Sequence, residues 1–220
     1  VVISAIQWCV IFLQSVPPDL LNIEDIIRDN YFLNNYLMSI RVKRLADFLV
    51  GIFLLMIFSP ILLLAGILIK FQDSGPIFYS QLRSGYKGAP FRIWKLRTMR
   101  EGAEINGAQW ASNNDPRITF LGRFLRKTRI DELPQLLTVI SGKMSLIGPR
   151  PERPEIERDQ LHVLRNYNLR YLFKPGLSGW SQVNYPYGAS VKDSDIKLSF
   201  DLFYLANFSL LLDLIIFFKT

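Results

Sequence analysis

The longest apolar stretch of the chain runs from Phe48 to Ile69, and its length would span a bilayer, which takes about 20 residues. Ser59-Pro60 lies near its middle. A proline inside a helix removes a backbone donor and clashes with the carbonyl four residues earlier, so a kink is predicted there. Basic residues flank both ends, whereas the positive-inside rule concentrates them on one side of a spanning helix. Two alternatives stay open: a kinked spanning helix, and a helix that bends and leaves the bilayer on the side it entered.

The pattern after this stretch predicts a globular part built from short elements. Two strands are expected there, joined by a glycine-rich turn at Ser84–Gly88. The predicted strands are Pro76–Tyr79 and Phe91–Leu96, and the predicted helices are Arg117–Lys127, Leu133–Ile140 and Glu155–Arg170. The last apolar segment, Phe200–Phe218, contains several polar residues, so we expect an amphipathic helix that lies on a membrane or on the core.

Four regions follow from these patterns. Residues 1–40 are interpreted as the tail of a preceding region and its linker, because the apolar residues 1–13 are too short for a complete span. Residues 41–71 hold the membrane helix, residues 72–199 form the globular domain, and residues 200–220 form an amphipathic C-terminal segment. We expect the first region to lie outside the functional unit. Since the chain starts with Val1, we expect it to be the C-terminal part of a longer protein.

The charge of the chain predicts an anionic partner, since 26 Lys and Arg against 19 Asp and Glu give a formal net charge of +7. Nucleic acid is disfavoured, because the basic residues form no continuous run and no zinc-finger or RNP-like signature is present. Anionic lipid and phosphorylated substrates better fit a basic domain beside an apolar stretch. The single cysteine, Cys9, excludes an intrachain disulfide, and the single histidine, His162, excludes a multi-histidine metal site.

Asp131 and Glu132 are the leading candidates for chemistry. Thr128 three residues before Asp131 resembles a capping box, and Pro134 fits only the first turn of a helix, so the pair is predicted at a helix N-terminus. There the helix dipole and nearby cations favour the ionised form. An ionised carboxylate is a competent nucleophile toward phosphorus, and its neighbour could hold Mg²⁺. Acidic residues are also common as simple helix caps, so the dipeptide alone is weak evidence.

Two basic segments could bind phosphate. In the stretch Leu146–Pro154, glycine and prolines fix a stiff loop that presents Arg150 and Arg153, and arginine suits bidentate phosphate contact. Lys95 and Arg97 fall on one face of a predicted strand and could point at a shared anion. The alternatives are a solvated surface loop and an ordinary solvated strand face.

Taken together, these segments resemble the bacterial sugar transferase family, the monotopic phosphoglycosyl transferases that start glycan assembly on polyprenol phosphate. The matching motifs occur in order from about residue 41 to residue 220, and such an ordered set is specific. They are Lys43-Arg44-x-x-Asp47, Ser59-Pro60, Phe91–Met99, Asp115–Thr119, Gly122–Thr128, Asp131–Gln135, Gly148–Pro151 and Lys174–Trp180. Arg129 and Phe120 depart from the family's usual residues, and neither belongs to the acidic pair.

The resemblance implies an α/β fold, mostly helical with a small sheet, that associates with the membrane through a re-entrant helix and amphipathic surface helices. It further implies that Asp131 attacks the sugar-bearing phosphate of a UDP-sugar and expels UMP. The resulting aspartyl sugar-phosphate then passes to polyprenol phosphate, with Glu132 and Asp131 holding Mg²⁺. The implied location is the cytoplasmic face of the bacterial inner membrane, and a homo-oligomer is possible.

The remaining site residues come from the residue patterns and from the resemblance together. Predicted phosphate- and nucleotide-binding residues are Lys95, Arg97, Arg126, Arg150, Glu152 and Arg153; the predicted re-entrant motif is Lys43, Arg44, Asp47, Ser59 and Pro60. Two other functions compete with the transferase: a non-catalytic scaffold for glycan assembly, and a hydrolase that passes the sugar-phosphate to water. The sequence does not identify the sugar.

Overall fold

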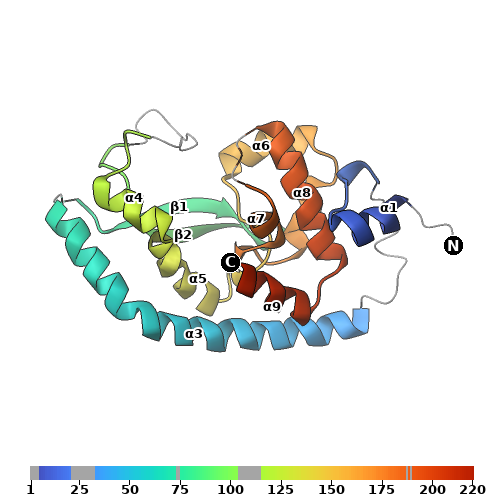
Figure 1. The fold of residues 1–220 in the computed structure, drawn as a ribbon, viewed down its shortest axis with the longest axis horizontal. Coiled ribbons are helices and arrows are strands. Elements are labelled where there is room, and N and C mark those ends of the chain that lie inside the picture. The colour runs from blue at the N-terminus through green and yellow to red at the C-terminus, as the bar shows by residue number, and fades with distance from the viewer. Residues whose placement is uncertain (1–4, 21–32, 73–74, 104–114, 187, 189) are drawn as a thin grey trace.

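In the computed structural model, which describes residues 5–20, 33–72, 75–103, 115–186, 188 and 190–220, helices dominate and two small sheets lie among them (Figure 1). The α-helices are α1 (Ala5–Trp8), α3 (Leu33–Gln72), α4 (Phe120–Lys127), α5 (Leu136–Ile140), α6 (Pro154–Val163), α7 (Trp180–Asn184), α8 (Val191–Ala206) and α9 (Leu210–Lys219). A π-helix covers Cys9–Leu13, and short 3₁₀ helices cover Pro18–Leu20, Tyr86–Gly88, Ile130–Gln135 and Tyr167–Leu172. The strands are β1 (Phe78–Ser84), β2 (Pro90–Leu96), β3 (Ser145–Ile147) and β4 (Gly176–Ser178).

The predicted hairpin is confirmed, and both of its strands are longer than expected, although β1 begins at Phe78 and not at Pro76. β1 and β2 pair antiparallel from Phe78 opposite Leu96 to Ser84 opposite Pro90. The parallel pair β3–β4 was not predicted, because three-residue strands have too little pattern to detect. The predicted helix Glu155–Arg170 is wrong in its second half. It ends at Val163, and Asn166 then adopts a left-handed conformation with φ of 61°.

The apolar stretch forms the middle of α3, a single 40-residue helix that runs along one side of the domain and bends toward its C-terminal end (Figure 1). Pro60 lies inside the helix and has no N–H to donate to the carbonyl of Met56. The hydroxyl of Ser59 donates to that same carbonyl at 2.9 Å. The dipeptide therefore explains how the helix continues through the proline: the side chain of Ser59 satisfies the acceptor that Pro60 leaves open.

Before the bend, α3 is tied to the domain by the charged residues predicted as part of a membrane motif. The guanidinium of Arg44 donates to the carbonyls of Val139 and Ile140, each at 2.6 Å, and so satisfies the last carbonyls of α5. Lys43 and Asp47 attach the same part of α3, the arm before the bend, to the domain. Lys43 Nζ lies 2.6 Å from a carboxylate oxygen of Asp213, and Asp47 accepts the backbone N–H of Leu146 at 3.0 Å.

After the bend, α3 packs against the same domain through apolar contacts. Ala65 and Ile69 are buried and form a small cluster with Leu96 at the end of β2 and Leu125 of α4. Residues 38–72 are long and apolar enough to cross a membrane, yet contacts with one globular domain occur on both sides of the bend.

The larger core centres on α8. Leu198, Leu202 and Tyr204 are almost wholly buried in it, and Asp201 is buried beside them. The single helix predicted for Phe200–Phe218 is wrong. α8 ends at Ala206, and α9 starts after Ser209, whose hydroxyl accepts the N–H of Leu212 at 3.1 Å. α8 is a core helix, because its apolar residues meet other protein side chains.

The described part of the N-terminal region also packs on this core. Val16 is fully buried and its N–H donates to the carbonyl of Ser199 at 2.9 Å. The indole N–H of Trp180 donates to the carbonyl of Gln14 at 2.9 Å. The segment around Gln14 and Val16 is therefore held against α7 and α8 by backbone hydrogen bonds and by burial.

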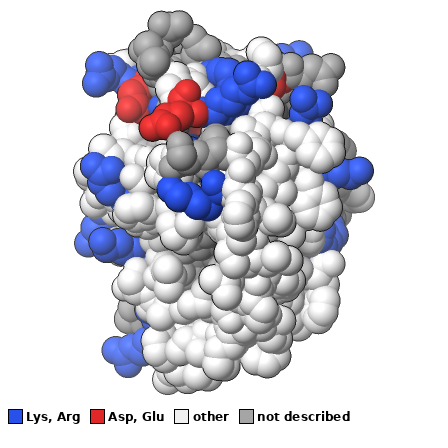
Figure 2. Space-filling model, turned by 90° about the vertical axis from the view of Figure 1, so that its left-hand side faces the viewer, with Lys and Arg blue, Asp and Glu red and all other residues white. Residues whose placement is uncertain are grey.

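Charge is distributed unevenly over the surface. Figure 2 views the molecule from the side where α3 bends, and acidic side chains there gather at the top with several basic ones. The lower part of that face is largely uncharged. On this side of the molecule, charged side chains of both signs are therefore concentrated at one end.

Candidate active site

Asp131 and Glu132 lie in the 3₁₀ helix Ile130–Gln135, which joins α4 to α5. The predicted capping box is wrong, because the hydroxyl of Thr128 donates back to the carbonyl of Phe124 at 2.9 Å and so closes α4. Arg129 then takes a left-handed conformation with φ of 58° and turns the chain into the new helix. The carboxylates are therefore placed by a tight helix-to-helix turn.

Glu132 is held by two cations from distant parts of the chain. Its Oε1 accepts from Lys95 Nζ at 2.5 Å and from Arg150 Nη2 at 2.9 Å, and its Oε2 lies 3.8 Å from Arg129 Nη1. Burial favours the protonated form, but Arg150 and Lys95 outweigh it and hold the pKa of Glu132 well below its usual range. Glu132 therefore stays ionised, and it joins β2, the Gly148–Glu152 loop and the acidic turn, as we call the 3₁₀ helix Ile130–Gln135 that carries Asp131 and Glu132.

Asp131 has the opposite electrostatic character. It is only 7% exposed, and burial raises its pKa to about 6, against the opposing charge of Lys95 and with a further increase from Glu132. The nearby cations Lys95, Arg126 and Arg129 do lower the pKa of Asp131, as predicted, but the effect of burial is larger, so the net shift is upward. At neutral pH the group is still mostly ionised, and its raised pKa makes it a more basic nucleophile than an exposed aspartate.

Lys95 and Arg97 have different neighbours in the structure. Lys95 binds Glu132, and burial lowers the pKa of its ammonium while Glu132 raises it. Arg97 follows the end of β2, and its guanidinium lies against Gly75, where an added Cβ would come within 1.8 Å of Nη1. The two residues share a predicted face, but only Lys95 reaches the acidic pair through a described hydrogen bond. The predicted phosphate contact of Arg97 stays a prediction.

Arg126 faces Asp131 from α4. Its Nε donates to the hydroxyl of Thr98 at 2.8 Å, and its charge lowers the pKa of Asp131 against the larger effect of burial. The carbonyl of Thr98 accepts the N–H of Thr119 at 3.0 Å, which ties the start of α4 to the end of the hairpin. Gly122 permits this approach, because a Cβ there would lie 2.1 Å from that carbonyl.

Glu152 and Arg153 lie on the loop that carries Arg150. Their immediate partners are protein residues: a carboxylate oxygen of Glu152 lies 3.5 Å from Arg83 Nη1, and Arg153 Nε lies 3.7 Å from Glu155. Arg83 also donates to the carbonyl of Pro151 at 3.0 Å. Arg83 is a site residue that the sequence did not single out, since a basic residue at a strand end has no distinctive pattern.

Arg170 is a second missed residue, and it supports Arg150 from behind. It is buried, and its Nη2 donates to the carbonyl of Arg150 at 2.7 Å and to Asp201 at 2.9 Å. Asp201 also accepts the hydroxyl of Ser181 at 2.8 Å. Asp201 is the one carboxylate in the apolar second half of α8, residues 198–206, and this was the available signal, because a buried charge usually requires a partner. Arg170 thus connects the core of α8 to the loop that holds Glu132.

We expect Asp201→Asn to lower the free energy of unfolding by up to about 3–5 kcal/mol, because it removes the carboxylate nearest to the buried Arg170 and leaves Glu157, at 3.8 Å, as its remaining ion-pair partner. Chemical denaturation in detergent measures this loss. Asp195→Asn makes the same change on the same helix at a less buried position and should change stability little. Equal stabilities of the two variants would contradict a supporting role for the Asp201–Arg170 pair.

The acidic pair fits a divalent cation only in combination with a phosphate ligand. Among the residues that the structure describes, no group of three or more histidine, cysteine or acidic side chains could hold a metal ion by itself. Mg²⁺ is commonly bound by one or two carboxylates together with substrate phosphates and water. Asp131 and Glu132 meet that requirement, because they are adjacent carboxylates beside cations that could also bind a diphosphate.

The chain is similar to known proteins over most of its length. The profile of a family described as bacterial sugar transferase matches residues 38–220. A UDP-N-acetylgalactosamine-undecaprenyl-phosphate N-acetylgalactosaminephosphotransferase of Aeromonas hydrophila is 43% identical over 179 residues, which are 81% of this chain and 42% of that relative. A UDP-glucose:undecaprenyl-phosphate glucose-1-phosphate transferase of Escherichia coli (strain K12) is 35% identical over 181 residues, 81% of this chain and 39% of the relative.

The chain thus spans about two fifths of the length of these two relatives. A shorter relative is matched more completely. Exopolysaccharide production protein ExoY of Rhizobium meliloti (strain 1021) is 39% identical over 194 residues, which are 81% of this chain and 83% of that relative. The residues that match the family profile include Asp131 and Glu132, the hairpin and most of α3.

Proposed function

The chain belongs to the bacterial sugar transferase family, and from this premise we propose that it moves a sugar 1-phosphate from a UDP-sugar to undecaprenyl phosphate or another polyprenyl phosphate. One observation carries the proposal: Glu132 is locked by Lys95 and Arg150, while the adjacent Asp131 is buried with a pKa raised to about 6. We therefore assign the role of nucleophile to Asp131 and the role of holding the neighbouring cations to Glu132. The named activities of the relatives supply the substrate classes.

In the first half-reaction, an ionised oxygen of Asp131 attacks the sugar-bearing phosphorus of the UDP-sugar. A bond forms between that oxygen and phosphorus, the bond from this phosphorus to the bridging oxygen breaks, and UMP leaves with the bond's electron pair. The sugar-phosphate remains on Asp131 as an acyl phosphate. The raised pKa of Asp131 suits this role, since the group is basic enough to attack and still ionised at neutral pH.

In the second half-reaction, a phosphate oxygen of the polyprenyl phosphate attacks the same phosphorus. The bond to Asp131 breaks and the carboxylate is regenerated, which gives a polyprenyl diphosphate sugar. Using one carboxylate twice lets two bulky phosphates occupy the same site in turn. This product would begin surface-polysaccharide assembly, in agreement with the exopolysaccharide role named for one relative.

The neighbouring residues orient and neutralise the phosphates. Arg126 and Arg150 approach the acidic turn from α4 and from the Gly148–Glu152 loop, and arginine binds phosphate oxygens bidentately. Glu132 holds Lys95 and Arg150 in place, so that their charge lies next to Asp131. Arg97, Glu152 and Arg153 are proposed to complete the nucleotide-binding region.

Mg²⁺ is the proposed cofactor, held by Glu132 and Asp131 together with the diphosphate. When bound, it would neutralise charge on the phosphates and on the departing UMP. The carboxylates themselves provide oxygen ligands, which Mg²⁺ prefers.

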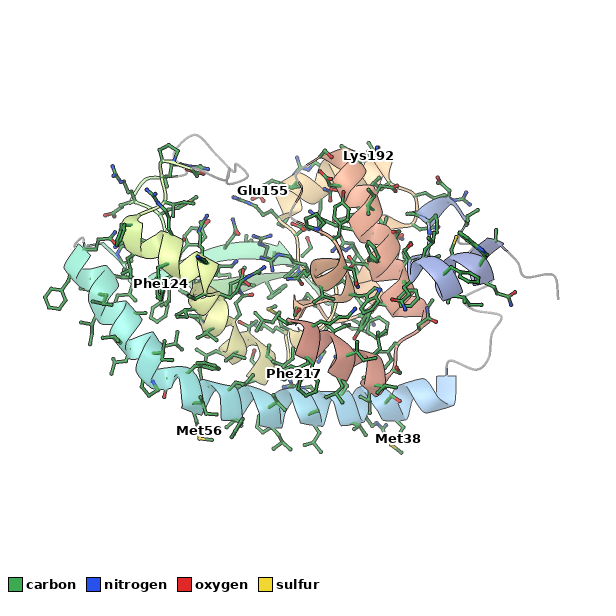
Figure 3. All side chains as sticks on the ribbon, in the orientation of Figure 1. Met38, Met56, Phe124, Glu155, Lys192 and Phe217 are labelled. Carbon is green, nitrogen blue, oxygen red and sulfur yellow. The ribbon has the colours of Figure 1, made fainter. Side chains whose placement is uncertain are left out.

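We also propose that α3 is re-entrant, so that both of its ends lie at the cytoplasmic face of the bacterial inner membrane. Contacts on both sides of the bend with one globular domain support this topology. In Figure 3, Met38 and Met56 project from the side of α3 that faces away from the domain, where they would contact the apolar interior of the bilayer. α9 adds exposed residues such as Leu211 and Phe218. A straight spanning helix would place the two ends of α3 on opposite sides of the membrane, so that both could not contact the same domain.

Cysteine labelling should detect the start of α3 and the hairpin that follows α3 on one side of the membrane. In a Cys9→Ser background, Arg41→Cys and Lys87→Cys are expected to react with a membrane-impermeant maleimide from the cytoplasmic side only. Met56→Cys, near the bend, should stay protected from both sides. Labelling of Arg41→Cys and Lys87→Cys from opposite sides would establish the kinked spanning alternative.

The proposed function is tested by UMP release from a panel of UDP-sugars by the reconstituted protein, with and without undecaprenyl phosphate. We expect release from one or a few sugars, sustained turnover only with the lipid phosphate, and a lipid-linked diphosphate sugar as product. Sustained release without the lipid would identify a hydrolase. No release from any sugar by folded protein would favour the non-catalytic scaffold.

A further inference from the structure

An apolar groove lies along α3 beyond its bend and is separate from the acidic turn. Its volume is about 510 Å³, which falls within the range of about 300–1,000 Å³ typical of small-molecule sites. Its walls come from the last three turns of α3 and from Ile77 and Phe78 at the start of the hairpin. Among the described residues of the lining, Lys70 is the one that carries a charge.

The groove exposes large apolar side chains that the described protein leaves uncovered. Leu63 is 68% exposed and Phe71 is 85% exposed. Gly66 contributes no side chain to the floor, and a Cβ at this position would lie 3.3 Å from Ile77. Contiguous exposed apolar surface with a concave shape usually marks a binding surface for an apolar molecule. The shape and composition of the groove therefore indicate a hydrocarbon ligand.

The groove and the acidic turn are linked through the hairpin. Phe78 lines the groove, and the next residue, Tyr79, pairs directly with Lys95. Lys95 in turn binds Glu132. Directly opposed residues of an antiparallel pair have their Cα atoms about 5 Å apart. Because successive side chains of a strand point to opposite faces, the groove and Lys95 lie on the two faces of the same hairpin.

α3 forms a second link between the groove and the acidic turn. Leu62 lines the groove and also packs against the cluster of Ala65, Ile69 and Leu125. Ile130, the residue directly before Asp131, packs on that same cluster. One helix arm thus has the groove on one side and supports the acidic turn on another.

We propose that this groove binds the first isoprene units of the polyprenyl phosphate acceptor, an inference that rests on the proposed transferase function. The branched apolar chain meets Leu63, Ile67 and Phe71, and it continues from there into the bilayer that α3 enters. Lys70 provides a positive charge that attracts the phosphate end, so that this end faces the domain. A cation in an otherwise apolar groove suits an amphiphile with one anionic terminus.

Leu63→Trp tests the groove directly, because it adds bulk at an exposed lining position. We expect it to raise the KM for undecaprenyl phosphate about tenfold, with the KM for the UDP-sugar unchanged. Leu64→Trp is the matched control: it has the same residue type, is 58% exposed on the same arm, and is not part of the lining. An active protein in which the two variants have equal lipid KM values would overturn the proposal.

A second measurement does not depend on turnover. Farnesyl phosphate with a diazirine on its first isoprene unit is photolysed with the protein in vesicles of phosphatidylethanolamine and phosphatidylglycerol. We expect the label within residues 62–78, with undecaprenyl phosphate competing and added phosphatidylglycerol not competing. Competition by phosphatidylglycerol would assign the groove to bilayer lipid, and label confined to other segments would also overturn the proposal. If the parent protein transfers no sugar phosphate but is labelled within residues 62–78, the proposed transferase function is contradicted and the proposed binding of polyprenyl phosphate in the groove is supported.

Discussion

Replacing Asp131 by asparagine is expected to reduce sugar-phosphate transfer at least about 10³-fold, because the amide cannot attack phosphorus and form the acyl phosphate. The side chain keeps its size, and the original carboxyl is buried without being one of the partners that hold the turn together. The free energy of unfolding should therefore not fall at neutral pH. Burial has raised the pKa of Asp131 from 3.8 to about 6, so the parent loses stability as the pH rises between these two values, and asparagine avoids this loss at neutral pH.

Two readouts check this expectation. The first is turnover with a UDP-sugar and undecaprenyl phosphate. The second is retention of labelled sugar-phosphate on the protein when the lipid is omitted, which should vanish in Asp131→Asn. Asp19→Asn, the same change at an exposed position, should match the parent in both. Labelled sugar-phosphate retained by Asp131→Asn would place the nucleophile elsewhere.

The acidic turn could be located from the sequence, but its electrostatics could not. Adjacent carboxylates after a basic cluster form a local pattern, and the order of the motifs made Asp131 and Glu132 the leading candidates. The pKa of Asp131 depends on how deeply the fold buries it, and no local pattern contains that information. The predicted capping box failed for a related reason: Thr128 had two backbone partners available, and tertiary structure selected the carbonyl behind it.

The same distinction applies to the fold. The length of the apolar stretch and the position of Pro60 were sufficient to predict a long bent helix. Apolar content alone could not distinguish a membrane-facing helix from a core helix, so α8 and α9 were predicted as one element although α8 is buried. Arg83 and Arg170 were missed because their roles arise only from contacts with residues far away in sequence.

Replacing Glu132 by glutamine is expected to lower transfer about 10²-fold and to move its pH dependence toward acid. The loss in rate follows from the loss of the carboxylate that fixes Lys95 and Arg150 next to the reacting phosphate. In the parent protein the first half-reaction should rise with pH through a midpoint near 6, since Asp131 reacts when ionised.

The sign of the shift follows from the charges around Asp131. The negative charge of Glu132 raises the pKa of Asp131, and Lys95 lowers it. Glutamine at position 132 removes the negative charge that raises the pKa of Asp131 and leaves the positive charge of Lys95, which lowers it. The midpoint of the pH dependence is therefore expected to fall below that of the parent. The variant should therefore lose less activity, relative to the parent, at pH 5 than at pH 8. Single-turnover UMP release across this range measures the midpoint, with Glu155→Gln as an exposed control. An unchanged midpoint would show that Glu132 does not set the protonation of Asp131.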